Sequence, residues 1–284
     1  MNIIELFENA GIYRTNLREF NPEDIAKIQK QFEIERAQHS NLDSSVASNL
    51  ILAMNEFPNE LLSISNNRIL YNLFSKKNYS RNRFSSDNAV SVSLEAVKVF
   101  IIRFLSEALT LFIEERMAQN DFEAIEDILM VKEYLPEESL DLLRERVTGK
   151  LDFVLDKLDQ NFSMGDHNIK SIYFIKFRPF YALLANFKSV DTDMKIRLLQ
   201  NKITSPILNQ EIKSIFTEAT IIAMSNYNAL NPELDSFLKA NREKLTESYE
   251  TTSSSSDSGM SPWAIVGIIV LVLRVIFFIA RLAK

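Results

Sequence analysis

Few side chains in this sequence are suited to catalysis or metal binding, and they lie far apart along the chain. The 284 residues include two histidines, His39 and His167, and no cysteine. Glu35 and His39 are four residues apart on a predicted helix and could share a metal ion, but two ligands do not complete a site. No HExxH pattern is present, and the absence of cysteine excludes thiolate metal sites and a cysteine nucleophile. We therefore expect no metal site, no cofactor and no enzymatic activity.

Glycine is scarce, with five residues in 284, and no two of them are closer than eight positions. Phosphate-binding loops, dinucleotide-binding turns and nucleophile elbows need closely spaced glycines for positive φ or close backbone approach. The sequence therefore excludes these three motifs. A Ser–His–Asp triad assembled from distant positions stays open, although nothing in the sequence marks a nucleophile.

One basic segment could bind anions. Between Leu61 and Ser86 there is no acidic residue, and aromatic side chains alternate with five basic ones: Arg68, Lys76, Lys77, Arg81 and Arg83. Such a segment can contact phosphates and stack on bases, or lie on anionic lipid. We favour the alternative of a solvated loop with Tyr71 and Phe74 in the core. Because the net charge of the chain is −6, we do not expect nucleic acid as a partner.

A second aromatic and basic stretch covers residues 169–187, where Pro179 should kink or divide a helix. Its basic side chains are Lys170, Lys176, Arg178 and the adjacent Lys188. We expect this stretch to contribute to the core or to a groove for a partner rather than to a ligand site.

The most informative stretch is an apolar run near the end of the sequence. Trp263 to Leu282 reads WAIVGIIVLVLRVIFFIARL. A helix of about twenty residues, at about 1.5 Å per residue, crosses a bilayer core of about 30 Å. The run therefore predicts a transmembrane helix over residues 263–282, between a Ser-rich tether at 247–262 and a short tail at 283–284.

Two observations on orientation conflict. Arg281 and Lys284 follow the run, whereas residues 248–262 contain no Lys or Arg, so the charge bias alone places the C-terminal end in the cytoplasm. The N-terminal residues do not read as a secretory signal, because Glu5 and Glu8 interrupt the apolar positions. We give the missing signal more weight and expect a single-pass protein with most of the chain in the cytoplasm. The spacer, the span and the short tail resemble tail-anchored proteins as a class, which is a topology and not a family.

Arg274 lies just past the midpoint of the predicted span. Its side chain can extend toward the headgroups beside Arg281, or it can lie at a contact between copies of the helix. Gly267 adds a small residue that suits helix–helix contact. The sequence leaves both interpretations open, and the second makes a homo-oligomer through the span one of the expected partners.

The rest of the chain, residues 1–246, has the periodicity of an all-α body, either a multi-helix bundle or an irregular helical array. A polar stretch near 76–87 is the best internal boundary. The predicted helices cover about residues 2–10, 22–38, 44–57, 58–62, 87–119, 121–129, 136–158, 169–187, 191–202, 206–226 and 232–248. We expect Asn21, Asn120 and Asn231 to precede helix starts.

Two of these helices carry specific predictions. Residues 87–119 are apolar on nearly all sides, which predicts a buried central helix, and four charges in 94–113 argue against a second membrane span. The helix after Pro136 has a packing seam with a weak coiled-coil character, for which we prefer a partner within the fold: Leu140, Leu143, Val147, Leu151, Val154 and Leu158.

Taken together, the sequence predicts a membrane-anchored interaction domain, that is, a scaffold, adaptor or regulator whose partners are the lipid bilayer and an unidentified protein. Two alternatives remain. One is a membrane-perturbing effector whose C-terminal helix oligomerises. The other is a nucleic-acid or anionic-lipid binder that uses residues 68–83.

Overall fold

A computed structural model describes residues 1–9, 19–38, 44–75, 92–159, 169–208 and 215–253. Every regular element in these ranges is a helix, which confirms the predicted all-α class. The α-helices are α1 (Ile3–Asn9), α2 (Pro22–Gln38), α3 (Ser44–Glu56), α4 (Pro58–Asn66), α5 (Arg68–Ser75), α6 (Leu94–Phe104), α7 (Ser106–Gln119), α8 (Phe122–Leu129), α9 (Glu137–Asp159), α10 (Ile169–Ile172), α11 (Arg178–Asn186), α12 (Val190–Leu208), α13 (Ile215–Met224) and α14 (Pro232–Ser253). Two 3₁₀ helices complete the set: η1 (Lys132–Tyr134) lies between α8 and α9, and η2 (Tyr173–Lys176) lies between α10 and α11.

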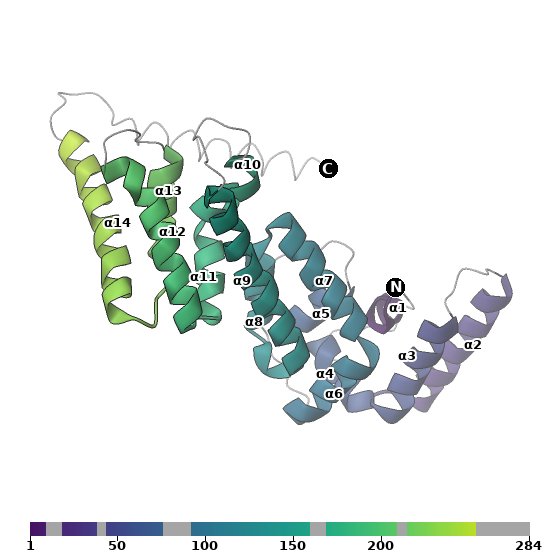
Figure 1. Ribbon diagram of the computed structural model, residues 1–284. Coiled ribbons are helices and arrows are strands. Elements are labelled where there is room, and N and C mark those ends of the chain that lie inside the picture. The colour runs from purple at the N-terminus through teal and green to yellow at the C-terminus, as the bar shows by residue number, and fades with distance from the viewer. Residues whose placement is uncertain (10–18, 39–43, 76–91, 160–168, 209–214, 254–284) are drawn as a thin grey trace.

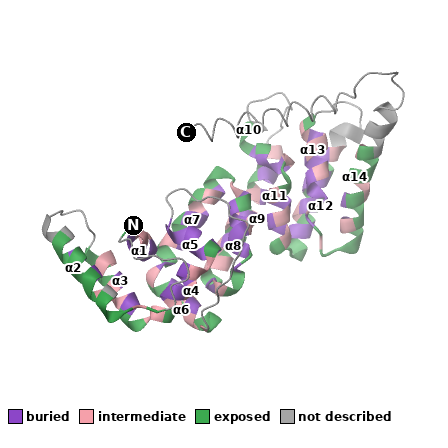
Figure 2. Ribbon diagram, turned by 180° about the vertical axis from the view of Figure 1, so that it is seen from behind, coloured by how far each residue is buried: buried purple, intermediate pink, exposed green. Residues whose placement is uncertain are grey.

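The helices form an elongated, curved array, with α2 and α3 at one end and α14 at the other (Figure 1). Elements close in sequence are close in space: α1 packs on α3 and α5, α7 on α8 and α9, α9 on α12, and α13 on α14. One cluster of buried apolar side chains nevertheless extends from Ile3 to Leu238, along the inward faces of the helices (Figure 2). The described residues therefore adopt the irregular array that was one of the two predicted arrangements.

Asparagine caps begin two helices where the sequence predicts them. The Asn21 side-chain oxygen accepts a hydrogen bond from the backbone N–H of Glu23 at 3.0 Å. Asn231 does the same for Glu233 at 2.9 Å, at the start of α14. Each bond satisfies a backbone donor that has no partner within the helix.

The predicted continuous helix over residues 87–119 is wrong for residues 92–119, and its first part, 87–91, lies outside the described residues. The chain turns at Leu105, whose φ of −131° and ψ of 0° separate α6 from α7. Val99, Ile102 and Leu111 are about half exposed, so the two helices are not buried on all sides. Because α6 and α7 run in different directions, each of them buries only one face. Some of their apolar side chains therefore stay on the exposed face.

The most enclosed element is instead α5. Seven of its eight residues, Ile69 to Ser75, are buried. It packs against α1, α4, α7 and α8. Asn67 caps it, because its side-chain oxygen accepts from the backbone N–H groups of Ile69 and Leu70, both at 3.1 Å.

The predicted cap at Asn120 is displaced by one residue. Asn120 has a φ of 56°, the left-handed region that asparagine tolerates, and it ends α7. Asp121 begins α8 by accepting a hydrogen bond from the backbone N–H of Ala124 at 3.3 Å.

Two predicted boundaries near the C-terminal end are also wrong. Pro206 does not start a helix, since α12 continues past it to Leu208. The predicted tether at 247–262 is shorter than expected, because α14 extends to Ser253. The part of the tether that lies outside the described residues is 254–262.

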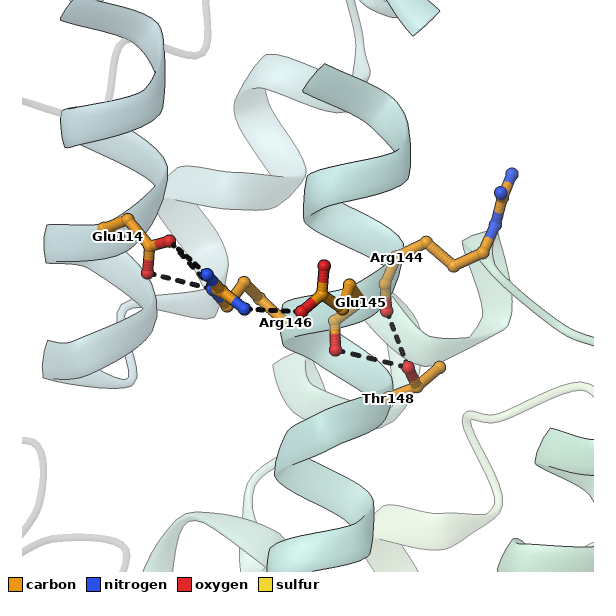
Figure 3. A network of polar contacts seen from close by, with 5 residues as sticks. All are labelled: Glu114, Arg144, Glu145, Arg146 and Thr148. Atoms are coloured by element: carbon orange, nitrogen blue, oxygen red, sulfur yellow. Dashed lines mark hydrogen bonds and ion pairs between the residues drawn. The ribbon is translucent and has the colours of Figure 1, made fainter. Parts of the chain in front are cut away.

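The seam of α9 is confirmed as an intramolecular contact. Leu143, Val147, Leu151 and Val154 are fully buried, and α9 packs on α7, α11 and α12. A bidentate ion pair fixes α9 to α7 (Figure 3): Arg146 Nε donates to the Glu114 carboxylate oxygens at 2.8 and 3.0 Å. Hydrogen bonding to Glu114 raises the pKa of Arg146.

Candidate interaction surface

Most predicted site residues lie outside the described ranges: Trp263, Gly267, Arg274 and Arg281 of the span, Lys76, Lys77, Arg81 and Arg83 of the basic segment, and both histidines. Arg68 is described and is exposed at the start of α5, whereas Tyr71 and Phe74 are buried there. Tyr71 and Phe74 therefore belong to the core.

Within the described ranges, no helix has the length and apolar character needed to cross a membrane. The same part of the chain contains no group of three His, Cys, Asp or Glu side chains placed to bind a metal ion.

An apolar groove of about 380 Å³ lies between the first turns of α12 and the start of α14. Three large apolar side chains at its rim face solvent, since Val190 is 74%, Met194 62% and Leu230 48% exposed. Leu234 is buried at its base. The volume is within the range of about 300–1,000 Å³ typical of ligand pockets.

The sequence brings these side chains to one face by helical spacing. Val190, Met194 and the exposed Leu198 are four residues apart on α12, so they lie in one row. Ser189 starts this helix, since its hydroxyl oxygen accepts a hydrogen bond from the backbone N–H of Thr192 at 3.1 Å. The row therefore begins at the N-terminal end of α12.

Asp193 fixes the other wall of the groove. Its buried carboxylate accepts three hydrogen bonds: from the Tyr227 hydroxyl at 2.8 Å, from the backbone N–H of Leu230 at 3.3 Å and from that of Asn231 at 2.7 Å. Burial, followed by the hydrogen bond to Asp193, raises the pKa of Tyr227. The loop between α13 and α14 is thereby held against α12.

One positive charge at the rim is uncompensated. Arg197 is exposed, and within the described residues it forms no ion pair. The neighbouring Asp191 is already paired with Lys195, at 2.9 Å. The groove thus offers apolar contacts, a wall held in place by Asp193 and one cation, which suits the binding of an apolar segment that carries an acidic residue.

A larger cleft of about 570 Å³ lies between α1, α3 and α7. Glu5, Glu107 and Glu115 line it, together with Arg116, which pairs with Asp121 at 3.2 Å. Three carboxylates therefore line the cleft, and its arginine is already engaged by Asp121. We therefore regard the α12–α14 groove as the candidate site.

This groove was not predicted from the sequence. The available signal was the row of apolar residues at 190, 194 and 198 on a helix that starts with acidic residues. In the sequence, such a row looks the same as the core-facing side of a helix. Only the structure shows that the other side of α12 is the buried one. No protein-family model, curated protein or solved structure significantly matches this chain.

Proposed function

We propose that this chain is a membrane-anchored interaction protein, in which the α12–α14 groove binds a segment of a partner protein and residues 263–282 hold the body at a bilayer. The observation that supports the binding role is the groove itself, where three exposed apolar side chains lie at the rim and Asp193 holds the wall formed by Leu230 and Asn231. The anchoring role rests on the apolar sequence of residues 263–282.

The chemistry of the groove favours an amphipathic helix with an acidic residue as its occupant. Apolar side chains at three- and four-residue spacing can cover Met194 and Leu230, and an acid beside them can pair with Arg197. A groove of this size supports weak, reversible binding. Association costs several kcal/mol in lost translational and rotational freedom, and a small contact area offsets this cost only in part. Attachment of both partners to one membrane would raise their effective concentration and offset this weakness.

The location of the groove agrees with this role. It lies where α14 begins, whereas the chain proceeds toward residues 263–282 from the far end of the same helix (Figure 1). A helix of 22 residues is about 33 Å long. The groove would therefore be held away from the bilayer, accessible to a partner.

A peptide-display selection against the full-length chain in nanodiscs tests the occupant. Selected peptides should share apolar residues at helical spacing with one acid. Arg197→Glu should convert the preference from an acidic to a basic residue, because the charge at the rim is reversed. Met194→Lys should abolish binding, because a charge would then lie in the apolar row.

The matched control is Arg242→Glu, which reverses an exposed charge elsewhere on α14 and should leave the selection unchanged. Peptides without an acid, or peptides whose binding survives Met194→Lys, would rule out the groove as the partner site.

A further inference from the structure

A second exposed surface lies at the opposite end of α13 and α14 from the groove. It is formed by η2 and its neighbours: Tyr173 and Phe177 are about half exposed, and Ile215 is 86% exposed. The Tyr173 ring stacks on that of Phe216, with centroids 5.9 Å apart and planes 17° apart. We call these residues, together with the basic residues Lys170, Lys176 and Arg178, the η2–α13 surface.

The surface is held rigidly from beneath. In and beside η2 the side chains face two sides: Ile172, Phe174 and Ile175 are buried, while Tyr173 and Phe177 face solvent. The Phe174 ring packs against those of Phe122 and Phe180, at centroid distances of 5.5 and 5.0 Å. The exposed aromatic rings are therefore presented by a fixed turn.

Positive charge is concentrated around these rings. Four of the elements at this end, α10, η2, α11 and α13, carry three basic residues, Lys170, Lys176 and Arg178, and one acid, Glu218. Lys176 Nζ lies 3.4 Å from the centroid of the Tyr173 ring and 5.0 Å from that of Phe177. In a chain with a net charge of −6, this local excess is the opposite of the average. Aromatic rings accompanied by basic side chains are typical of contacts with membrane interfaces.

The position of the surface in the array matches a membrane contact. In both overall views, α10 and the start of α13 lie at the same end as the last turns of α14 (Figures 1 and 2). Between Ser253, where α14 ends, and Trp263 there are about nine residues, which span at most about 30–32 Å even when fully extended. This end of the body must therefore lie close to any bilayer that contains residues 263–282.

We propose that the η2–α13 surface docks the body on an anionic bilayer, with Tyr173, Phe177 and Ile215 at the headgroup level and Lys170, Lys176 and Arg178 against lipid phosphates and carboxylates. The proposal uses the anchor of the proposed function to bring the surface near the bilayer, but the lipid chemistry comes from the surface itself. Residues 263–282 are not its occupant, because Arg274 and Arg281 would be repelled by the same positive charge.

The absence of cysteine allows a direct test, since one introduced cysteine can be labelled uniquely. The full-length chain with Ile215→Cys, carrying a polarity-sensitive fluorophore, is incorporated into nanodiscs of phosphatidylcholine alone or with phosphatidylserine. The emission should shift to the blue in the discs with phosphatidylserine. About 1 M salt, at which the Debye length is about 3 Å, should reverse the shift.

Charge variants identify the groups responsible. Lys170→Glu with Lys176→Glu and Arg178→Glu should abolish the shift, which corresponds to a loss of roughly 100-fold in the docking equilibrium. The matched control reverses three exposed charges on α2, η1 and α9, Lys30→Glu with Lys132→Glu and Arg144→Glu, and should keep the shift. A label at Met194→Cys, in the groove, should report the same emission in both kinds of disc.

The outcomes separate the docking surface from the anchor. Equal emission in both kinds of disc, with the chain incorporated, would overturn docking and leave the anchor intact. A shift that needs no phosphatidylserine and survives the triple charge reversal would also overturn it, because another apolar partner would then cover the surface.

If the chain does not incorporate, the anchor is wrong. The label is then measured with vesicles of both compositions, where a phosphatidylserine-dependent shift supports the surface and an unchanged emission overturns it.

Discussion

At the scale of single residues, Asp193 determines the shape of the groove. Its carboxylate is buried in the first turn of α12, where the helix dipole favours a negative charge. Its three donors come from positions 34 to 38 residues further along the chain. Loss of this carboxylate would release the wall formed by Leu230 and Asn231.

Asp193→Ala should lower the free energy of unfolding by about 2–4 kcal/mol, because it leaves a buried hydroxyl and two backbone N–H groups without an acceptor. Asp191→Ala, two residues earlier and exposed, removes an ion pair with Lys195 at the surface and should cost less than about 1 kcal/mol. Urea unfolding followed by circular dichroism measures both. Equal losses for the two variants would contradict the assigned role of Asp193.

Two buried tyrosines differ in how their hydroxyl groups are satisfied. The Tyr227 hydroxyl donates to Asp193, whereas the Tyr181 hydroxyl has no hydrogen-bond partner among the described residues. Tyr227→Phe should therefore lower the free energy of unfolding by about 1 kcal/mol, and Tyr181→Phe should leave it unchanged or raise it by about 1 kcal/mol.

The same tyrosines predict a loss of stability at high pH. Burial raises the pKa of Tyr181, and burial with the hydrogen bond to Asp193 raises that of Tyr227. The stabilisation is complete below the unfolded pKa of about 10 and is lost as the pH rises, because the unfolded chain releases these protons first. Between about pH 10 and 11 each tyrosine should account for about 1 kcal/mol, so Tyr227→Phe should reduce the alkaline loss by that amount. Unfolding curves at both pH values that show an unchanged loss would contradict this.

The caps show what the sequence predicts at this scale. Asn21 and Asn231 begin helices as expected, because a cap bonds to backbone two or three residues away. The role of Asp193 was not predictable, since its partners are distant in the sequence and only the folded chain brings them together.

At the scale of helices, the break at Leu105 shows why periodicity misled the prediction for residues 87–119. The hydrogen bonds from Leu105 to the Ile101 carbonyl and from Leu109 to the Leu105 carbonyl, both 2.9 Å, continue the helical pattern through the turn. The apolar spacing is therefore preserved, although the axis changes direction. Helix type was predicted correctly here, whereas burial depended on that change of direction.

Adjacent isoleucines on α6 test this arrangement. Ile101 is fully buried and Ile102 is half exposed. Ile101→Ala should cost about 2–5 kcal/mol of unfolding free energy because it leaves a cavity, whereas Ile102→Ala should cost less than about 1 kcal/mol. Thermal and urea unfolding of the two variants measure the difference. Similar large losses of unfolding free energy for both variants would contradict this arrangement and support the fully buried helix that the sequence predicts.

The two candidate surfaces also differ in how far the sequence predicted them. The stretch at 169–187 was recognised as aromatic and basic, and the division near Pro179 is confirmed by the separation of η2 from α11. Which rings face solvent could not be predicted, because a 3₁₀ turn does not follow the α-helical period. The groove needed the fold itself, since its two walls come from α12 and from the loop before α14.

At the scale of the whole molecule, the two proposed surfaces lie at opposite ends of the helices α13 and α14. The η2–α13 surface lies at the same end as the last turns of α14, and the groove lies where α14 starts (Figure 1). Extension of α14 to Ser253 shortens the connection to residues 263–282, so the body would be held near the bilayer in a restricted orientation. The groove would then face partners on the same side of the membrane.

The central claim is that residues 263–282 anchor this body to a bilayer, and flotation of the full-length chain with reconstituted liposomes tests it most directly. We predict that the chain floats with the lipid after a wash in about 1 M salt, which removes proteins held only by surface charge. Ile269→Asp with Val272→Asp should prevent this, because each charge costs about 2.5–3.5 kcal/mol near the centre of a span. A full-length chain that stays with the soluble fraction, as the double variant should, would contradict the account.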